Sequence, residues 1–224
     1  MTFSIVARCK TTGQLGAAVS SSSPAVASRC IRAKAGVGVA ASQNITDPHL
    51  ANILLDLIKY DVSPNDAIQE LVANTDFIEY RQLLVLNMQG QVAAYSGEKT
   101  LGIYHAYTGQ EVACAGNLLA NPDVPQTMCQ AFEQSQGCLA ERLLLAMQAG
   151  LTAGGEAGSV HSAGLLVVDK VQWPIVDLRV DWSESDPIGE LYNIWKIYQP
   201  QVEDYVLRAL NPSSSPSYGV PGDP

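Results

Sequence analysis

The chain has 224 residues, a length that suits one globular domain with a substantial buried core. Its formal net charge of −9 would repel a phosphate backbone, so nucleic acid is excluded as an expected partner. No apolar run approaches the roughly 20 residues that span a bilayer, and no export leader is recognisable, so we expect no membrane partner and a cytoplasmic location.

The five cysteines indicate neither a disulfide framework nor a metal site. They are odd in number, widely spaced and without a C-x-x-C pair or a histidine at ligand spacing. We therefore expect buried free thiols, and no metal or other cofactor. The cysteines are Cys9, Cys30, Cys114, Cys129 and Cys138.

The chain opens on a predicted strand, residues 2–8, in which apolar and small polar side chains alternate with a period of two. If Met1 is removed, the freed α-amine lies beside the hydroxyl of Thr2 on an ordered element. A threonine whose own amine accepts its proton is a self-contained nucleophile. Thr2 is therefore the leading catalytic candidate, and the alternative is that it only begins a strand.

The next segments combine a small-residue strand, a serine-rich bend and a group of positive charges. Residues 15–20 read as a strand that pairs with the first, and Ser20–Pro24 as a bend. Residues 25–34 hold the densest positive charge of the chain, which either reaches solvent or is aimed at a site. A buried strand is predicted over 35–41.

The middle of the chain predicts two helices and three strands. One helix begins at Pro48 with Thr46 or Asp47 as its N-cap, and another begins at Pro64. A hairpin covers 80–87 and 91–96, residues 101–110 remain unassigned, and a buried strand over 111–116 leads into Asn117. His105 reads as an ordinary surface or loop histidine.

The last third predicts helices over 124–136 and 139–152, a strand pair over 161–169 and 175–181, and a helix from Pro187 that Pro200 kinks or splits. The glycine-rich loop 154–158 lacks the Lys-Ser or Lys-Thr of a phosphate-binding loop. We expect a single domain over residues 1–209 and a disordered tail rich in Pro, Ser and Gly over 210–224.

Runs of strands alternate along the chain with runs of helices. This order favours an α+β fold with antiparallel sheets and segregated helices over a parallel, doubly wound sheet. Strands that are apolar on both faces are accounted for if two sheets pack together and each is covered by helices. The predicted architecture is a four-layer α-β-β-α sandwich.

Several motifs, in order, resemble the bacterial domain-of-unknown-function family 1028, DUF1028. They are TFSIVAR, TGQLGAAVSS, AKAGVGVAASQ, AYSG, AGNLL, ERLLLAMQAG with AGGEAG, and VDLRVD before a Pro-x-x-Glu-Leu helix. The resemblance runs from Thr2 to about Tyr198. It implies the fold of the N-terminal nucleophile hydrolases, whose nucleophile is the first residue of the mature chain, here Thr2.

The resemblance also implies further site residues. Lys34 stands where the family commonly has arginine, and a cation beside the amine would lower the pKa of that amine. Asn117 matches a family asparagine and is expected either to donate to an oxyanion or to serve as a turn residue. Gln43, Ser21 and His161 are expected to bind substrate, although the segment 20–29 and His161 depart from the usual family pattern.

The function expected from these observations is an N-terminal-nucleophile amidohydrolase that cleaves an amide-type C–N bond of an unknown small substrate. The alternative is a non-catalytic binding or assembly protein of the same fold. A Cys-His hydrolase is disfavoured because no cysteine has an activating sequence context. The apolar stripe of the last helix is expected to be core or to form a homodimer or higher homo-oligomer.

Overall fold

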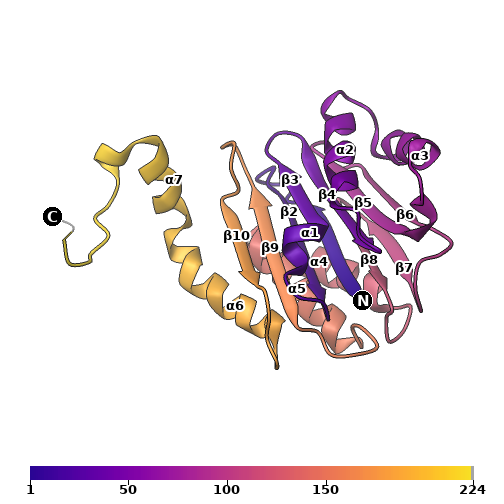
Figure 1. Cartoon of the computed structure of the whole chain (residues 1–224). Helices are drawn as coiled ribbons and strands as arrows, with labels where there is room; N and C mark the ends of the chain where they lie inside the picture. The colour runs from indigo at the N-terminus through magenta and orange to yellow at the C-terminus, as the bar shows by residue number, and fades with distance from the viewer. Residues whose placement is uncertain (223–224) are drawn as a thin grey trace.

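The computed structural model describes residues 1–222 and begins with the predicted antiparallel strand pair (Figure 1). Strands β1 (Thr2–Arg8) and β2 (Leu15–Ser21) pair with Phe3 opposite Ser20 and Arg8 opposite Leu15. Gly13, at φ 78°, closes the turn between them in a conformation that other residues rarely adopt. The first strand is therefore ordered from its first residue.

β1 lies in the interior of a six-stranded antiparallel sheet, where it pairs with both β2 and β8. The strand order is β10-β9-β2-β1-β8-β7. The remaining strands of this sheet are β7 (His105–Gly109), β8 (Val112–Asn117), β9 (Ser162–Val168) and β10 (Val176–Val180).

A second antiparallel sheet of four strands has the order β3-β4-β5-β6. Its strands are β3 (Ile31–Lys34), β4 (Gly38–Asn44), β5 (Arg81–Asn87) and β6 (Val92–Ser96). Buried side chains from the facing surfaces of both sheets form one apolar layer, with Val6 and Val19 from the first sheet and Leu84 from the second. The two sheets therefore pack face to face.

Helices cover the outer face of each sheet (Figure 1). On the six-stranded sheet, α4 (Val124–Gln134) and α5 (Leu139–Thr152) pack against β1, and α6 (Pro187–Tyr198) packs against β9 and β10. On the four-stranded sheet, α2 (Pro48–Lys59) and α3 (Pro64–Asn74) cover Leu83 and Val85. The fold is α+β with two antiparallel sheets, consistent with the predicted sandwich.

The capping residues explain where three of the helices begin. Asp47 rather than Thr46 caps α2, because its Oδ1 accepts a hydrogen bond of 2.9 Å from His49 N. Ser63 caps α3 through Asp66 N, and Asp186 caps α6 through Gly189 N. A proline follows each cap at the first helical position, where its missing N–H has no partner to lose.

The structure differs from the predicted elements in two places. Residues 25–34 contain a short helix, α1 (Val26–Cys30), followed by β3, and a turn then delays the predicted strand at 35 until Gly38. Gly36 takes a positive φ of 72° in that turn. The unassigned segment 101–110 holds the edge strand β7, whose half-exposed side chains give no clear alternation.

The C-terminal helix is split, as predicted, at Pro200. A 3₁₀ turn (Gln199–Gln201) separates α6 from α7 (Val202–Leu210), which projects from the sandwich (Figure 1). After Leu210 the described chain adds only a 3₁₀ turn, Pro212–Ser214. The last two residues of the expected tail, 223–224, lie outside the described residues.

Two further expectations concern membrane helices and cysteines. Within residues 1–222, none of the helices has both the length and the apolar character that crossing a bilayer requires. All five cysteines are free, and four of them are buried. Cys138 is exposed, which corrects the expectation for that thiol, because it precedes α5 at the surface.

Candidate active site

Thr2 lies at one end of the space between the two sheets. It is the first residue of β1, is 5 % exposed, and stands opposite Asn117 at the end of β8. Because side chains alternate along a strand and Phe3 packs under the helices, Thr2 and Ser4 point toward the four-stranded sheet. The candidate nucleophile is therefore buried, next to Asn117.

A cluster of hydroxyl groups surrounds the peptide carbonyl that precedes Thr2. Thr2 Oγ1 and Ser21 Oγ both donate hydrogen bonds to Met1 O. The two hydroxyl oxygens are 3.4 Å apart, and Ser21 Oγ is 2.9 Å from Ser23 Oγ. The structure thus brings the predicted residues Thr2 and Ser21 together, and it adds Ser23.

Arg29 of α1 is the cation that hydrogen bonds connect to this cluster. Its Nη2 donates to Ser23 Oγ at 2.9 Å, and its Nη1 donates to Pro24 O at 2.6 Å. Ser23 links the guanidinium to Ser21, which in turn contacts Thr2. The positive charge aimed at the site therefore comes from the predicted basic segment, but from a different residue than Lys34.

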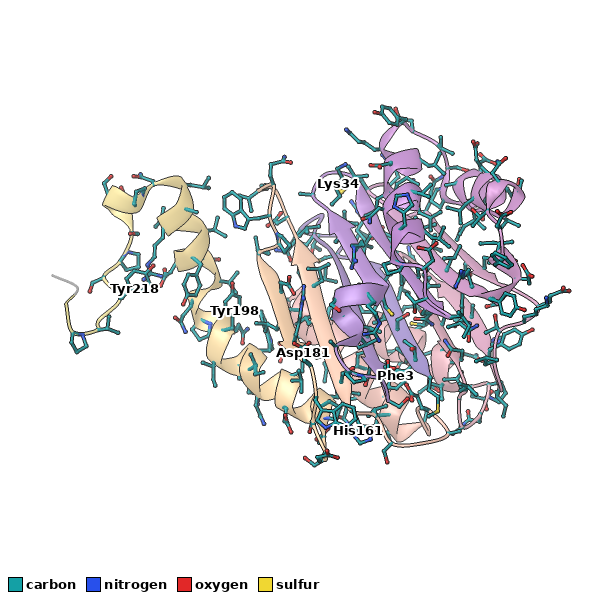
Figure 2. The ribbon with its side chains drawn as sticks, viewed as in Figure 1. Phe3, Lys34, His161, Asp181, Tyr198 and Tyr218 are labelled. Carbon is teal, nitrogen blue, oxygen red and sulfur yellow. The ribbon has the colours of Figure 1, made fainter. Side chains whose placement is uncertain are left out.

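Lys34 lies at the opposite end of the sheets and is not brought to Thr2. Figure 2 shows Lys34 at one end of the strands, with Phe3 and His161 at the other. Lys34 stands opposite Gly38, and its Nζ forms an exposed ion pair of 3.4 Å with Asp56. The prediction that Lys34 lies beside the amine is corrected because β3 carries the chain away from the site.

Glu156, which the sequence analysis overlooked, contributes a buried carboxylate. It is 4 % exposed, and both of its carboxylate oxygens accept from Ser22 N at 3.2 Å. Burial raises the pKa of Glu156 from 4.5 to about 7, while the N-terminal ammonium and the hydrogen bonds from Ser22 oppose the increase. The one signal in the sequence was a single acidic residue inside a glycine-rich loop, 154–158.

A buried polar network joins the two sheets behind the hydroxyl cluster. Ser4 Oγ donates to Gln43 Oε1 at 2.7 Å, and Gln43 Nε2 donates to Gln82 Oε1 at 2.8 Å. Gln82 Oε1 also accepts from Asn117 Nδ2 at 3.2 Å, and Gln82 Nε2 donates to Gly116 O at 3.0 Å. These bonds connect β1 and β8 with β4 and β5.

The network includes two of the predicted site residues, Gln43 and Asn117. Gln43 is 1 % exposed and its oxygen and nitrogen are both bonded within the network, so it supports the site instead of facing substrate. Asn117 Nδ2 already donates to Gln82, and its buried Oδ1 has no hydrogen-bond partner. Asn117 therefore keeps an unpaired acceptor, Oδ1, and its Nδ2 has a second N–H besides the one that bonds Gln82.

His161 borders the site through its backbone. Its N–H donates to Ser21 O at 2.8 Å, and its ring stacks on Trp182 with centroids 4.4 Å apart and planes 11° apart. The Nδ1 atom lies 2.8 Å from Ser183 O, and since a carbonyl only accepts, Nδ1 carries the proton. His161 therefore holds β2 in place, and only its Nε2 remains available to a ligand.

Unusual backbone conformations occur around this end of the sheets. Ala25, after the serine-rich bend, has a φ of 51°, and Leu118, directly after Asn117, also has a φ of 51°. Residues with a Cβ in this region are strained by about 1–3 kcal/mol each. The strained residues hold the two chain segments that carry Ser23 and Asn117.

The chemistry available at the site follows from these groups. Two hydroxyls meet at one carbonyl oxygen, a guanidinium lies behind them, and the buried carboxyl of Glu156 accepts from Ser22 N, next to Ser21 in the chain. Hydroxyl nucleophiles, hydrogen-bond donors to a carbonyl oxygen and a nearby amine are the components of acyl transfer. In the described chain, no group of three His, Cys, Asp or Glu side chains is placed to hold a metal ion.

Comparison with known proteins gives a family match over most of the chain. Residues 2–191 match a family described as DUF1028, a family of unknown function. The crystal structure of a Silicibacter pomeroyi protein described under the same family is similar, with a TM-score of 0.85 and 29 % sequence identity over 91 % of this chain and 89 % of that one.

Two more distant matches are structures described as Anbu. The Anbu, ancestral beta-subunit, of Yersinia bercovieri is 10 % identical and that of a Hyphomicrobium species 11 % identical, each over 91 % of this chain and 97 % of the other. Their TM-scores of 0.36 are too low to support an argument. A search of curated proteins gives no match.

Proposed function

The chain belongs to the DUF1028 family, and from this membership together with the buried hydroxyl cluster at the start of β1 we propose that it is an N-terminal-nucleophile amidohydrolase. In this proposal Met1 is removed, Thr2 becomes the first residue, and its Oγ1 attacks the carbonyl of an amide-type C–N bond in a small substrate. Two antiparallel sheets with helices on both outer faces suit such a site, because the first strand begins between the sheets.

One observation carries the proposal. A carbonyl oxygen already lies between Thr2 Oγ1 and Ser21 Oγ, and both hydroxyls donate to it. An attacking hydroxyl must reach the carbon of such a carbonyl, and a second donor must stabilise the negative charge that forms on the oxygen. The site therefore holds a carbonyl where a nucleophile and an oxyanion donor meet.

The free amine of Thr2 serves as the base. It accepts the proton of Oγ1 as Oγ1 bonds to the substrate carbonyl carbon, which gives a tetrahedral intermediate. Arg29 places a positive charge behind Ser23 and Ser21, and this charge lowers the pKa of the amine and favours its neutral form. We assign to Arg29 the task that the sequence analysis gave to Lys34.

Ser21 takes the oxyanion role that Asn117 was expected to fill. Its Oγ points at the carbonyl oxygen, and Ser23 N donates to that Oγ at 3.1 Å, which fixes the orientation of the hydroxyl. Asn117 stands opposite Thr2, so its unpaired Oδ1 is suited to accept an N–H of the freed amine. Asn117 is therefore a positioning residue.

The cycle ends with hydrolysis of an ester. The intermediate collapses, the C–N bond breaks, and the departing amine takes the proton held by the amine of Thr2. A water molecule then attacks the acyl carbon and gives one proton to the same amine, the C–Oγ1 bond breaks, and the amine returns that proton to Oγ1 as the acid leaves. The side chains named above and water complete these steps.

Two measurements test the proposal. Intact-mass spectrometry of the purified native protein should show the loss of Met1, and a screen of small amides should reveal hydrolysis that Thr2→Ala abolishes and Thr2→Ser retains in part. The matched control is Thr12→Ala, an exposed threonine in the β1–β2 turn. Equal hydrolysis by the wild type and Thr2→Ala would remove Thr2 from the mechanism.

A non-catalytic binding or assembly protein is the second candidate, and one observation favours it. With Met1 in place its carbonyl occupies both hydroxyls, and Thr2 has no free amine. A native protein that retains Met1 would support this reading.

We also propose that α6 and α7 join two copies of the chain. Ile197 of α6 is 71 % exposed and Leu210 of α7 is 64 % exposed, so both helices present large apolar side chains to solvent. Under this proposal wild-type protein elutes as a dimer in size-exclusion chromatography with light scattering, and Ile197→Glu elutes as a monomer. A monomeric wild type would refute it.

A further inference from the structure

Met1 presents the candidate site with a complete α-aminoacyl group. Its carbonyl oxygen accepts from Thr2 Oγ1 and Ser21 Oγ, and the next residue, Ser22, donates its N–H to the carboxylate of Glu156, which is therefore held beside the segment that Met1 contacts. Its side chain lies over Gly158, with Cε 3.3 Å and Sδ 3.9 Å from the position that a Cβ on Gly158 would take. The carbonyl and the side chain of Met1 therefore lie against different parts of the site, with the carboxylate of Glu156 in the same region.

Glu156 is a buried carboxylate that no basic side chain neutralises. Among residues 1–222, none of the lysines, arginines or histidines forms an ion pair with it, and its hydrogen bonds come from the backbone N–H of Ser22. A buried negative charge without a counter-ion is unfavourable. A ligand that brings an ammonium group to this position is stabilised by the same carboxylate.

Gly158 leaves space beside the carboxylate. A side chain at position 158 would approach the terminal methyl of Met1, so glycine allows an unbranched apolar side chain to lie against the loop backbone. Met1 is 37 % exposed, and its surroundings are therefore open toward solvent on one side. The leaving group of an acyl-transfer substrate must depart into solvent, and this open side gives it a route.

From this placement we propose that the substrates are α-aminoacyl amides, that is, amino-acid amides or short peptides with a free N-terminus. The proposal rests on the proposed function. Once Met1 has left, the acyl part of the substrate takes its place, with its α-ammonium toward Glu156, its carbonyl oxygen at Ser21 and its side chain over Gly158. Oγ1 of Thr2 bonds to the carbonyl carbon, the C–N bond breaks, and the leaving amine carries away the proton that Oγ1 lost.

A competing explanation is that Glu156 interacts with the α-amine of Thr2 and not with the substrate. In that case the carboxylate would tune the amine of Thr2 and would affect every amide substrate equally. Recognition of the substrate's ammonium affects only substrates that carry one. The two explanations therefore differ in how the effect of a Glu156 substitution depends on the substrate.

The first experiment uses protein whose mass shows that residue 2 is the first residue. The probes are L-methioninamide and its deaminated analogue, 4-(methylthio)butanamide. Glu156→Gln is expected to raise the KM for methioninamide at least tenfold, with kcat within a factor of two, and to leave the analogue unchanged. The exposed Glu98→Gln is the matched control and should behave as wild type. An equal loss with both amides, or no loss with either, overturns the proposal.

A binding measurement separates failure of this inference from failure of the proposed function. In Thr2→Ala protein, calorimetry should show that methioninamide binds at least tenfold more tightly than the analogue, and adding Glu156→Gln should abolish the difference. Equal binding of the two amides refutes the substrate class, whatever the activity. Unchanged hydrolysis in Thr2→Ala refutes the nucleophile instead, and with it the mechanism on which the substrate class depends.

A second variant tests the subsite without altering the carboxylate. Gly158→Val fills the space beside the side chain of Met1, at a glycine whose φ does not require the left-handed region. We expect it to weaken methioninamide binding at least tenfold and to leave glycinamide binding unchanged. Equal weakening of both amides, or of neither, contradicts the position proposed for the substrate side chain.

Discussion

Replacing Glu156 with glutamine removes a buried group that should make the stability of the protein depend on pH. Burial raises the pKa of Glu156 from its ordinary value of 4.5 to about 7, and the side chain is only 4 % exposed. Between these two values the folded chain holds a proton that the unfolded chain has released. The free energy of unfolding therefore falls as the pH rises through this window.

The size of the effect follows from the two pKa values. A change from 4.5 to about 7 corresponds to about 3 kcal/mol of stability that wild-type protein loses between about pH 4.5 and pH 8. The amide of Glu156→Gln does not titrate, so this contribution is absent from the variant. The difference in unfolding free energy between variant and wild type should therefore grow with pH in favour of the variant.

The assay is urea denaturation at four pH values from 4.5 to 8, followed by the fluorescence of the three tryptophans, on chains that retain Met1. Other titrating groups are common to both proteins, so their contributions cancel in the difference. The exposed Glu98→Gln should stay parallel to wild type at every pH. Parallel curves for wild type and Glu156→Gln would show that the carboxyl titrates normally and that the burial argument is wrong.

Three further predictions concern the cations and the buried network. Lys34→Gln should leave hydrolysis unchanged and alter the unfolding free energy by less than about 0.5 kcal/mol, because its ion pair is exposed; a kinetic defect would return Lys34 to the site. Arg29→Gln should move the acidic limb of the pH–rate profile to higher pH, because the amine of Thr2 loses a nearby positive charge. Arg32→Gln is the control and should leave the profile unchanged; identical profiles for wild type and Arg29→Gln would refute the role of Arg29. Gln82→Leu should destabilise the fold by about 2–4 kcal/mol in urea, because two buried amides lose their acceptor, and a loss below about 1 kcal/mol would contradict the network.

Secondary structure was predictable where the pattern is local. A capping residue followed by proline, as in Ser63-Pro64 and Asp186-Pro187, is a signal contained in two adjacent residues. It predicts that a helix begins at the proline, and the structure confirms both helices. The alternation in residues 2–8 defines β1 in the same way. The edge strand β7 escaped prediction because neither of its faces is uniformly buried.

The position of a charge in space was not predictable from the same sequence. Arg29 and Lys34 are five residues apart in one basic segment, and nothing local distinguishes them. A short helix holds Arg29 near the serine-rich bend, and β3 then carries the chain about 13 Å toward the far end of the sheets over its four residues. The end of α1 at Cys30 and the course of β3 after it therefore separate the two cations.

The buried network depends on contacts between strands that are distant in the sequence. Gln43 and Gln82 each interrupt an otherwise apolar or small-residue strand, and they pair directly across β4 and β5. Neither glutamine alone indicates a partner, because register is a property of the folded sheet. The same limit explains why Asn117 was recognised as a strand-end residue while its bond to Gln82 was not foreseen.

Several unfavourable features occur together at the end of the sandwich that holds Thr2, and their occurrence there is an argument for function. Ala25 and Leu118, two non-glycine residues with positive φ, lie in the segments that carry Ser23 and Asn117. The unpartnered oxygen of Asn117 and the buried carboxyl of Glu156 occur at the same end. Each of these features lowers the stability of the folded chain. Structural needs alone would be met by the apolar packing that fills the rest of the space between the sheets, so the cost is best explained by a ligand that supplies the missing donor and the missing positive charge.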